Sequence, residues 1–351
     1  MENGGTLDKR FFYVAQMGSI QTQACADLPD EFMPKINEAK VAWLDYLVDS
    51  IDNESEKIAE KFGFSKRLVQ QLLKNRKSGY EDYDTEMGLK IPAIIVKGLE
   101  VKVSPVMVLI NERAILTIHS YKVQRFIRFR RYADAYLKKI PINLPANDRI
   151  TLLLCRLLDE NNSRNFDHLR EIEEQGDNMS KWMMDPDTPR SKLGPEIYKM
   201  KHSLIMYLNA LWDSLDVLNF LLYGDAKLMT DNQRILDRIE LLSNNVNRQI
   251  ELSEHMSEVL ASGLEVLQSI YNNQLQVLNN RMAFAMTYLT ILGTAVLVPN
   301  TIATVMSNPA YNMTPKDVGW YSALMVLTTI LSTLFAYMWV RKQGWFPKQF
   351  D

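Results

Sequence analysis

The sequence has few of the residues that build catalytic or metal centres. It contains two cysteines, Cys25 and Cys155, and four histidines in 351 residues. The histidines lack the spacing of a metal site, and no glycine-rich loop precedes a Lys-Ser or Lys-Thr pair, so no phosphate-binding loop is expected. Two cysteines suit a reducing compartment and predict no disulfide framework. We therefore expect neither an enzyme nor a bound cofactor.

Charged residues are missing from two long segments near the C-terminus. Asp, Glu, Lys, Arg and His are all absent from Met282–Pro315 and again from Val318–Val340. Helices over residues 282–306 and 321–340 would each extend roughly 30 Å or more, enough to cross the hydrocarbon core of a bilayer. We expect two transmembrane helices at these positions, joined by an external loop over residues 307–320.

The N-terminus lacks the basic patch and apolar run of a signal peptide, so the residues before the first span are expected to stay in the cytoplasm. Arg281 precedes the first span, a basic tail over residues 341–351 follows the second, and the loop between them holds only Lys316 and Asp317. By the positive-inside rule both termini are cytoplasmic. The expected protein is a multi-pass protein of the plasma membrane.

The first 145 residues mix helical and strand signals. Two segments that begin after Asn53 and Phe64 have helical spacing, with a serine near each start. Four short runs are typical of strands: Ala42–Leu47, Ile91–Val96, Val106–Ile110 and Ala114–His119. The last two, separated by Asn-Glu-Arg, predict a hairpin. We expect residues 1–145 to form a cytoplasmic α/β domain.

Residues 146–281 predict a cytoplasmic helical stalk region. Helical spacing runs from Arg149 to about Met184, from Pro195 to about Tyr223, and then without a break from Asp231 to Met306. This last helix would have roughly 76 residues, far more than the usual dozen. Its apolar positions form a heptad-compatible seam: Ile239, Leu242, Val246, Leu260, Leu264, Leu267, Tyr271 and Leu278.

Threonines interrupt the first apolar span at a regular spacing. At 100° per residue, five of them share a face about 100° wide: Thr287, Thr290, Thr294, Thr301 and Thr304. Leu297 and Asn308 lie on the same face. One interpretation is packing between membrane helices, with hydroxyls bonded to the backbone or across the interface. The other is that several copies surround a water path lined by rings of oxygen atoms, and Pro299 fits either interpretation.

A basic segment near the end of the α/β domain raises a different possibility. Residues 122–139 carry seven Lys and Arg side chains among aromatic ones, a combination found in nucleic-acid interfaces. The net charge of the chain is −2, which argues against a dedicated nucleic-acid surface. We interpret the segment as a solvated helix face beneath anionic lipid, and we expect no nucleic-acid partner.

Several stretches together resemble the CorA family of divalent-cation transporters over almost the whole chain. In the cytoplasmic part they are EKFGFSKRLVQQLL with the following YEDYD, VLINERAILTIHS, YKMKHSLIMYLNALWDSLDVLNFLL and ILDRIELL. In the spans they are MTYLTILGT, which places Met286, Leu289 and Thr290 on the family pattern, and RKQGW, which ends on Trp345. The resemblance implies a CorA-like fold and a homopentamer with the first span of each chain lining the pore.

The same resemblance implies passive passage of divalent cations, most of all Mg²⁺, along the face that holds the threonines. It also implies Asp237 and Glu240, at the stalk entry, as cytoplasmic cation-binding candidates that control opening. Solvated helix charges are the ordinary alternative for these two residues.

The end of the first span departs from the family pattern. Family members carry Gly-Met-Asn there, a signature associated with capture of a hydrated cation, whereas this chain has Met306, Ser307 and Asn308. Asn308 is therefore the candidate metal-binding residue, and Ser307 and Asp317 are the external-loop candidates. Zinc transport, nonselective cation transport and a non-conducting, membrane-anchored oligomeric scaffold or sensor stay open as alternatives.

Overall fold

The computed structural model describes residues 9–18, 20–27, 29–74, 79–184, 190–224, 226–308 and 314–342. The chain forms two compact units, Met1–Gly263 and Leu264–Asp351. The first unit is an α/β domain with a helical layer, and the second consists of the end of one long helix and a further apolar helix. This is the expected fold class, an α/β part followed by a long helix and two apolar C-terminal stretches.

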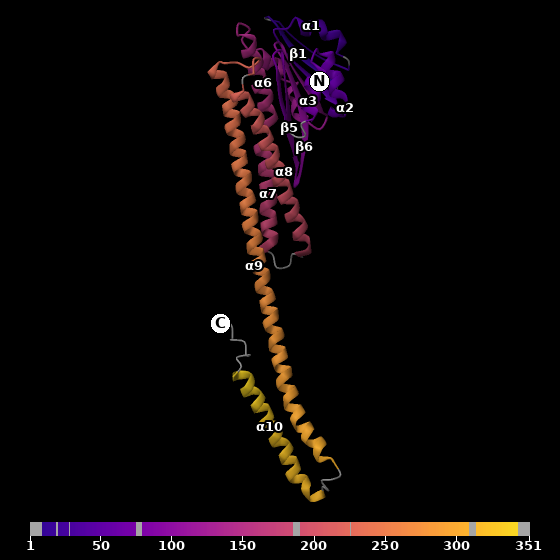
Figure 1. Cartoon of the computed structure of the whole chain (residues 1–351), viewed down its shortest axis with the longest axis vertical. Coiled ribbons are helices and arrows are strands. Elements are labelled where there is room, and N and C mark those ends of the chain that lie inside the picture. The colour runs from indigo at the N-terminus through magenta and orange to yellow at the C-terminus, as the bar shows by residue number, and fades with distance from the viewer. Residues whose placement is uncertain are drawn as a thin grey trace, which may run out of the picture. The chain divides into compact units, whose positions relative to one another are not determined.

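A seven-stranded sheet forms the centre of the first unit in the described part of the chain, in the order β2-β1-β3-β7-β6-β5-β4. Figure 1 labels β1, β5 and β6 of this sheet. β3 and β7 run parallel, and the other neighbouring strands are antiparallel. The strands are β1 (Phe11–Met17), β2 (Ile20–Ala26), β3 (Val41–Val48), β4 (Gly79–Tyr83), β5 (Glu86–Lys97), β6 (Glu100–Asn111) and β7 (Ala114–Ser120).

The four strands expected from the sequence all occur, within β3, β5, β6 and β7. The predicted hairpin is also confirmed, because β6 and β7 pair antiparallel with Ile110 opposite Ile115. β5 and β6 form a second, longer hairpin that was not expected from the sequence. Gly98 lies in its turn with a positive φ of 60°, a conformation that favours glycine. β1, β2 and β4 were not expected.

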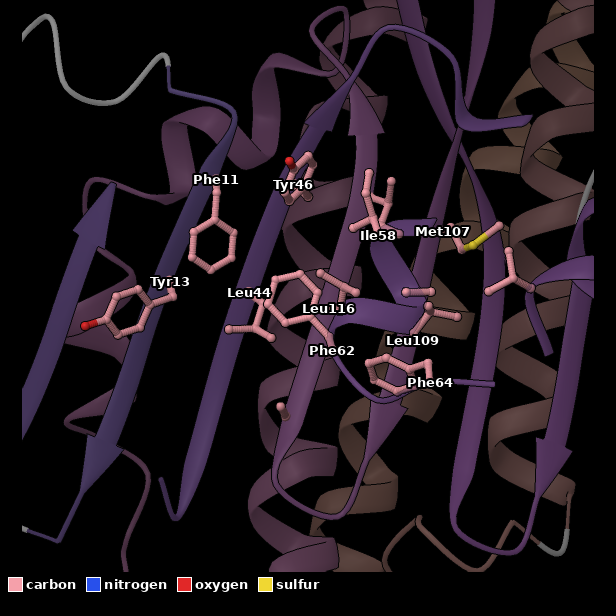
Figure 2. Close-up of a cluster of buried hydrophobic side chains, with 14 of the residues drawn as sticks. Phe11, Tyr13, Leu44, Tyr46, Ile58, Phe62, Phe64, Met107, Leu109 and Leu116 are labelled. Carbon is pink, nitrogen blue, oxygen red and sulfur yellow. The ribbon is translucent and has the colours of Figure 1, made fainter. Parts of the chain in front are cut away.

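One face of the sheet is covered by two short helices, α2 (Ile51–Lys61) and α3 (Lys66–Lys74). Alternate residues of the central strands point to this face, as period-two geometry requires. Figure 2 shows how Leu44, Leu109 and Leu116 of the sheet lie near Phe62 and Phe64, which connect the two helices. These five side chains are all buried, so this face holds a continuous hydrophobic core.

The two helices begin differently from each other. Ser65 caps α3, since its Oγ accepts a hydrogen bond from the Leu68 N–H over 3.2 Å, as expected for a serine at a helix start. The expectation for α2 was wrong. That helix begins at Ile51, and Ser55 lies inside it, donating to the Ile51 carbonyl. Glu54 does the capping instead, because its Oε1 accepts from the Asp49 and Ser50 N–H groups at 3.0 and 3.1 Å.

The other face of the sheet is covered mainly by α4 (Gln124–Phe129), α5 (Ala133–Leu137), α6 (Ala146–Asn162), α7 (Asn165–Met184) and α8 (Arg190–Tyr223). α6 packs on β3 and β7, and α8 packs on β5 and β6. α9 (Gln233–Met306) is one continuous helix of 74 residues, which confirms the expected long helix. The described residues also form the short helices η1 (Asp30–Phe32) and α1 (Met33–Asn37) on the first unit and η3 (Pro315–Asp317) on the second, where η3 leads into α10 (Val318–Lys342).

A fully buried charged cluster lies between the sheet and α4–α6. Asp45 of β3 accepts a hydrogen bond from Arg130 Nε over 2.7 Å and lies 3.0 Å from His119 Nε2 of β7. Thr117, beside Asp45 in the parallel register, donates its hydroxyl to the same carboxylate. The Trp43 indole N–H in turn donates to Thr117 Oγ1 over 3.1 Å. The cluster thus joins β3, β7 and the turn between α4 and α5.

The interpretation of residues 122–139 as a solvated helix face is wrong for two of its arginines. Arg125 and Arg130 are buried, with 5% and 1% of their surface exposed, so they are not part of a solvated face. Arg125 donates to the Ile94 carbonyl, and Arg130 pairs with Asp45. The physical reason is that each guanidinium finds an oxygen acceptor inside the domain, which compensates for its desolvation. Lys122, the first basic residue of the segment, is exposed as expected.

The start of α6 holds the connection between α8 and α9. Asp148, which is 8% exposed, accepts a hydrogen bond from the Thr230 hydroxyl, and Thr151 Oγ1 accepts from the Thr230 N–H over 3.1 Å. Asn147 Nδ2 donates to the Lys227 carbonyl over 2.8 Å. These bonds fix where α9 begins on the first unit.

The buried cluster predicts a large effect of Asp45→Asn on stability. The substitution keeps the size of the side chain but removes the charge that compensates Arg130, so we expect the domain to lose about 3–5 kcal/mol. Thermal unfolding of the full-length protein, followed by intrinsic fluorescence, measures the change. Asp49→Asn is the matched control, because Asp49 pairs with Arg10 over 2.8 Å while 69% of its side chain is exposed. The control should cost about 1 kcal/mol or less, and equal losses would contradict the assignment.

Because of the same carboxylate, we expect the stability of the domain to depend on pH. Burial disfavours the charged form of Asp45, but His119, Arg130 and the hydrogen bonds outweigh it and hold the pKa well below its usual range. A carboxylate whose pKa is lower in the folded state stabilises the fold above the unfolded pKa of about 3.9, and this contribution disappears as the pH falls from there through the folded pKa. Unfolding measured between about pH 5 and pH 2 should show this loss in the wild type and a smaller loss in Asp45→Asn.

Candidate functional site

The predicted pore-lining residues lie on the last part of α9, in the second compact unit. Two described helical segments are long enough, and contain a stretch apolar enough, to cross a membrane: Gln233–Met306 and Pro315–Lys342. The stretches that lack charge in the sequence lie in the last part of the first segment and in most of the second. The part of the basic tail after Lys342, with Trp345 and Lys348, lies outside the described residues, as do loop residues 309–313.

The threonine hydroxyls of α9 all bond to the backbone of their own helix. Each Oγ1 donates to the carbonyl oxygen four residues earlier, over 2.8 to 2.9 Å: Thr287 to Ala283, Thr290 to Met286, Thr294 to Thr290, Thr301 to Leu297 and Thr304 to Asn300. A hydroxyl in an apolar medium needs such an acceptor. The hydroxyl hydrogens are therefore satisfied without a partner helix, and each oxygen keeps lone pairs that can accept a further bond.

Within the second unit, few side chains of α9 are buried. Thr287 and Ala295 are buried, at 6% and 9% exposure, and the buried residues of α10 are Ser332, Ala336 and Val340. These side chains are small or short, the kind that allows two apolar helices to approach closely. Thr287 thus differs from the other four threonines, because its side chain is covered inside the chain.

The rest of the predicted face is accessible in the chain. Thr290, Thr301 and Thr304 are exposed, Thr294 is half-buried, and 63% of Leu297 is exposed. At 100° per residue these positions lie on one side of α9, beside Thr287 and away from Ala295. This side of α9, the open face, therefore carries exposed hydroxyls with Leu297 among them, while Ala295 is covered on another side. Whether each of these residues lines a pore stays a prediction.

Ser307 and Asn308 follow directly at the end of α9. The Ser307 hydroxyl donates to the Thr304 carbonyl over 2.8 Å, and the Asn308 N–H donates to the Val305 carbonyl over 3.2 Å. Both side chains are exposed. Asn308 continues the hydroxyl face, and an amide oxygen there can accept hydrogen bonds from water or contact a cation. Its role as a metal-binding residue stays a prediction.

Asp317 has a structural role that was not expected from the sequence. Its Oδ2 accepts hydrogen bonds from the N–H and the hydroxyl of Thr314, over 2.8 and 2.7 Å, and its Oδ1 accepts from the Trp320 indole N–H over 3.2 Å. This is a capping box at the start of the η3–α10 segment. The signal was present in the sequence, since Thr314, Pro315 and Asp317 occupy the positions of a capped helix start.

The two cytoplasmic candidates lie in the first turns of α9. Asp237 and Glu240 are both exposed, and Asp237 Oδ1 accepts a hydrogen bond from Gln233 over 3.0 Å. Among the described residues, no group of three or more His, Cys, Asp and Glu side chains is placed to hold a metal ion. The chain by itself does not gather ligands around these residues, and their role in cation binding stays a prediction.

The apolar seam of α9 becomes more exposed toward the C-terminal half of the helix. Ile239, Val246 and Leu260 are buried within the first unit, whereas Tyr271 and Leu278 are 48% and 54% exposed. Further apolar side chains are exposed over the same stretch: Val259, Val266, Ile270, Leu275 and Val277. A seam that is covered in one half and open in the other indicates a surface that another polypeptide can cover.

Comparison with known proteins supports the architecture as a whole. A family model described as CorA-like Mg²⁺ transporter protein matches residues 38–342. The complete structure of the CorA magnesium transporter from Methanocaldococcus jannaschii is similar over 95% of this chain and 98% of that chain, with a TM-score of 0.68 and 18% identity. A search of curated protein sequences found no match.

Two further solved structures share the fold. The cytoplasmic domain of ZntB from Vibrio parahaemolyticus is similar over 76% of this chain and 99% of its own length, with a TM-score of 0.56 and 13% identity. The full-length CmaX protein is similar over 97% of this chain and all of its own, with a TM-score of 0.53 and 14% identity. At these identities the structures show the common fold, and the family model carries the assignment to a family.

Proposed function

We propose that this chain, which belongs to the family of CorA-like Mg²⁺ transporters, assembles as a homopentamer in the plasma membrane and passes divalent cations passively, with Mg²⁺ as the principal cargo. The first span of each copy would face the central axis. The single observation that carries this proposal is the side of α9 on which the exposed side chains of Thr290, Thr301, Thr304 and Leu297 lie together, while Thr287 and Ala295 are covered inside the chain.

The open hydroxyl face favours a wet surrounding over lipid. Although the hydroxyl hydrogens bond to the backbone, the oxygen atoms of Thr290, Thr301 and Thr304 keep unused lone pairs at exposed positions. In hydrocarbon those lone pairs would meet no donor, whereas water along a shared axis supplies donors. Several copies that turn this face inward would surround the axis with stacked rings of oxygen atoms. Packing against a neighbouring helix is the alternative arrangement for the same face.

The exposed half of the α9 seam supports assembly of identical copies. Tyr271, Leu278 and the neighbouring exposed apolar residues form a long surface that water solvates poorly. A cyclic arrangement gives every copy the same contacts and closes on itself. It would also bring the open threonine faces of all copies to a common axis, so assembly and path formation would depend on the same helix.

The chemistry of the path suits a divalent ion that keeps much of its water. Mg²⁺ dehydrates reluctantly and is commonly bound through its water molecules. Hydroxyl oxygens and the Asn308 amide can accept hydrogen bonds from that water shell without holding the ion tightly. A 2+ ion moving inward gains about 4.6 kcal/mol per 100 mV of inside-negative potential, twice the single-charge value, so passage requires no other energy source.

The orientation follows from the distribution of basic residues. Arg281 lies just before the first span, and Arg341 and Lys342 end the second, so the three cations flank the same side of the helix pair. By the positive-inside rule this side is cytoplasmic. The α/β unit and both termini would then be cytoplasmic, and Ser307, Asn308 and Asp317 would lie at the external end.

Ion uptake into liposomes tests the proposed function. Purified full-length protein is reconstituted, an inside-negative potential is imposed, and uptake of Mg²⁺, Co²⁺, Ni²⁺ and Zn²⁺ is measured against protein-free liposomes. We expect Mg²⁺ uptake that rises with the potential, because the path is passive. Faster Zn²⁺ uptake would favour the zinc alternative and similar rates for all four ions the nonselective one. If no ion enters at any potential, transport is wrong and a non-conducting scaffold or sensor is favoured.

Leu297 provides a second test, because it is an exposed apolar residue among the threonines of the open face. A ring of leucines can close a path by excluding water. We expect Leu297→Ser to increase Mg²⁺ uptake severalfold, since a hydroxyl would hold water at that level. Val296→Ser is the matched control: Val296 is adjacent and 68% exposed, but about 100° away on the helix. Equal effects of the two substitutions would contradict the assignment of the face.

A further inference from the structure

The strand β2 forms one edge of the sheet and, among the described residues, pairs only with β1. Backbone bonds of β1 show which groups of β2 face outward. The carbonyls of Arg10 and Gln16 accept hydrogen bonds on the β3 side, from the Leu47 N–H over 2.7 Å and from the Lys40 N–H over 2.9 Å. Alternate residues from Arg10 to Gln16 therefore point their backbone groups toward β3 and away from β2.

The β2 residues opposite these positions point their backbone groups to the open edge. In an antiparallel pair, two opposite residues either exchange hydrogen bonds or both point away from each other. Gln21, Gln23 and Cys25 are the residues opposite the β1 positions that point toward β3. They present a row of backbone N–H and C=O groups that has no partner within the described part of the chain.

The other open edges of the sheet carry features that oppose the addition of a strand. β4, at the opposite edge, contains Glu81 and Asp82, and its Tyr80 ring stacks on Phe220 of α8 with the centroids 5.2 Å apart. The β5–β6 hairpin extends beyond its neighbouring strands. Its outer part holds prolines and charged residues, which protect an edge: Pro92, Lys97, Glu100, Lys102 and Pro105.

β2 has none of these protective features. Its sequence, IQTQACA, contains no charged residue and no proline, and the strand is seven residues long. The first side chain, Ile20, is 66% exposed, and Gln23 at the centre of the strand is exposed as well. An uncharged edge of this length is a template for pairing with another strand.

A second copy of the same strand meets the requirements of this edge. If two β2 strands lie antiparallel and are centred on Gln23, that residue lies opposite its own equivalent, and Gln21 lies opposite Cys25 of the other copy. The outward-pointing groups of one strand then face those of the other, so each of these pairs can exchange two backbone hydrogen bonds. A shift by one residue would place them opposite groups that point toward β1, which fixes the register.

The side chains agree with this register. On the face of the sheet that carries the core under α2 and α3, Thr22 would lie opposite Ala24 and Ile20 opposite Ala26. Small and apolar side chains meet there, and the exposed Ile20 side chains lose contact with water. The other face brings glutamine and cysteine side chains together. Like charges are not opposed at any position, because β2 carries no charge.

We propose that β2 is an interaction surface for a second copy of this chain, through which two α/β units join their sheets about a two-fold axis. Such a contact uses the same strand on both sides, whereas a ring uses two different surfaces of each copy. The β2 contact therefore joins copies from two separate assemblies and leaves the α9 seam free. It goes beyond the proposed function and does not depend on the passage of cations.

Mass photometry of the purified full-length protein in detergent tests the proposal over a range of concentrations. We expect a second population with twice the mass of the first, which grows as the concentration rises. Gln23→Lys should remove it, because like charges would meet at the centre of the contact. Gln23→Glu should remove it for the same reason. A mixture of the two variants should restore it, since opposite charges then meet.

Gln70→Lys is the matched control, because Gln70 is also an exposed glutamine of the first unit but lies on α3. This substitution adds the same charge away from the sheet edge, so the doubled population should stay as in the wild type. Thermal unfolding of each variant checks that the domain is folded. The Gln23 side chain is exposed, so we expect Gln23→Lys to unfold at the wild-type temperature.

The outcomes separate this proposal from the proposed function. If the wild type has a single mass at every concentration, or if Gln23→Lys and Gln70→Lys reduce the doubled population equally, β2 is not the contact. If the mixture of the two Gln23 variants stays single, the register centred on Gln23 is wrong and the proposal is overturned. Mg²⁺ uptake into liposomes should be the same for Gln23→Lys and the wild type, and a lack of uptake by both would contradict only the proposed function.

Discussion

A hydroxyl group in an apolar helix needs a hydrogen-bond acceptor, and the threonines of α9 find theirs one turn back in the same helix. The hydroxyl groups therefore place no requirement on how α9 packs against a neighbouring helix. Because the hydroxyl hydrogens require no neighbour, small residues such as Ala295 can be used for close packing on one face, and the hydroxyl oxygens can be left on another. The proposed water path and the role of Leu297 both depend on this arrangement.

A different constraint organises the α/β unit. Asp45, His119 and Arg130 are fully buried or nearly so, and removing such groups from water costs several kcal/mol each unless they are paired. Their mutual contacts join the one parallel strand pair of the described sheet to the turn between α4 and α5. The polar bonds of Asp148 then fix the connection that leads into α9. Burial of a paired charge and anchoring of the long helix therefore occur on the same side of the sheet.

Much of the architecture could be predicted from local patterns. The strands β5, β6 and β7 were predicted because their Val- and Ile-rich runs are buried on both faces, and α9 because no turn residue interrupts its spacing. β4 was missed because its sequence, GYEDY, is charged and lies at a sheet edge, where burial does not select apolar residues. β2, the other edge strand, was missed for the same reason, because its residues are only partly buried.

The contacts that join distant residues could not be predicted in this way. Arg130 is buried because Asp45 lies beside it, and these residues are 85 positions apart in the sequence. For the candidate site, helical geometry placed the threonines on one face, but it could not show that Thr287 is covered and Thr301 is open, because that depends on the packing around each side chain. The capping box of Asp317 was predictable from its spacing, and it was overlooked because the acidic residue was interpreted as part of an ion entrance.

The central claim is that copies of α9 turn their open hydroxyl face toward a shared, water-filled axis. A structure of the purified oligomer in lipid, at a resolution that shows ordered water, tests it most directly. The account predicts that the hydroxyls of Thr290, Thr301 and Thr304 surround an axial column of water or hydrated ions. Finding those side chains against lipid, or packed against dry protein away from the axis, would contradict it.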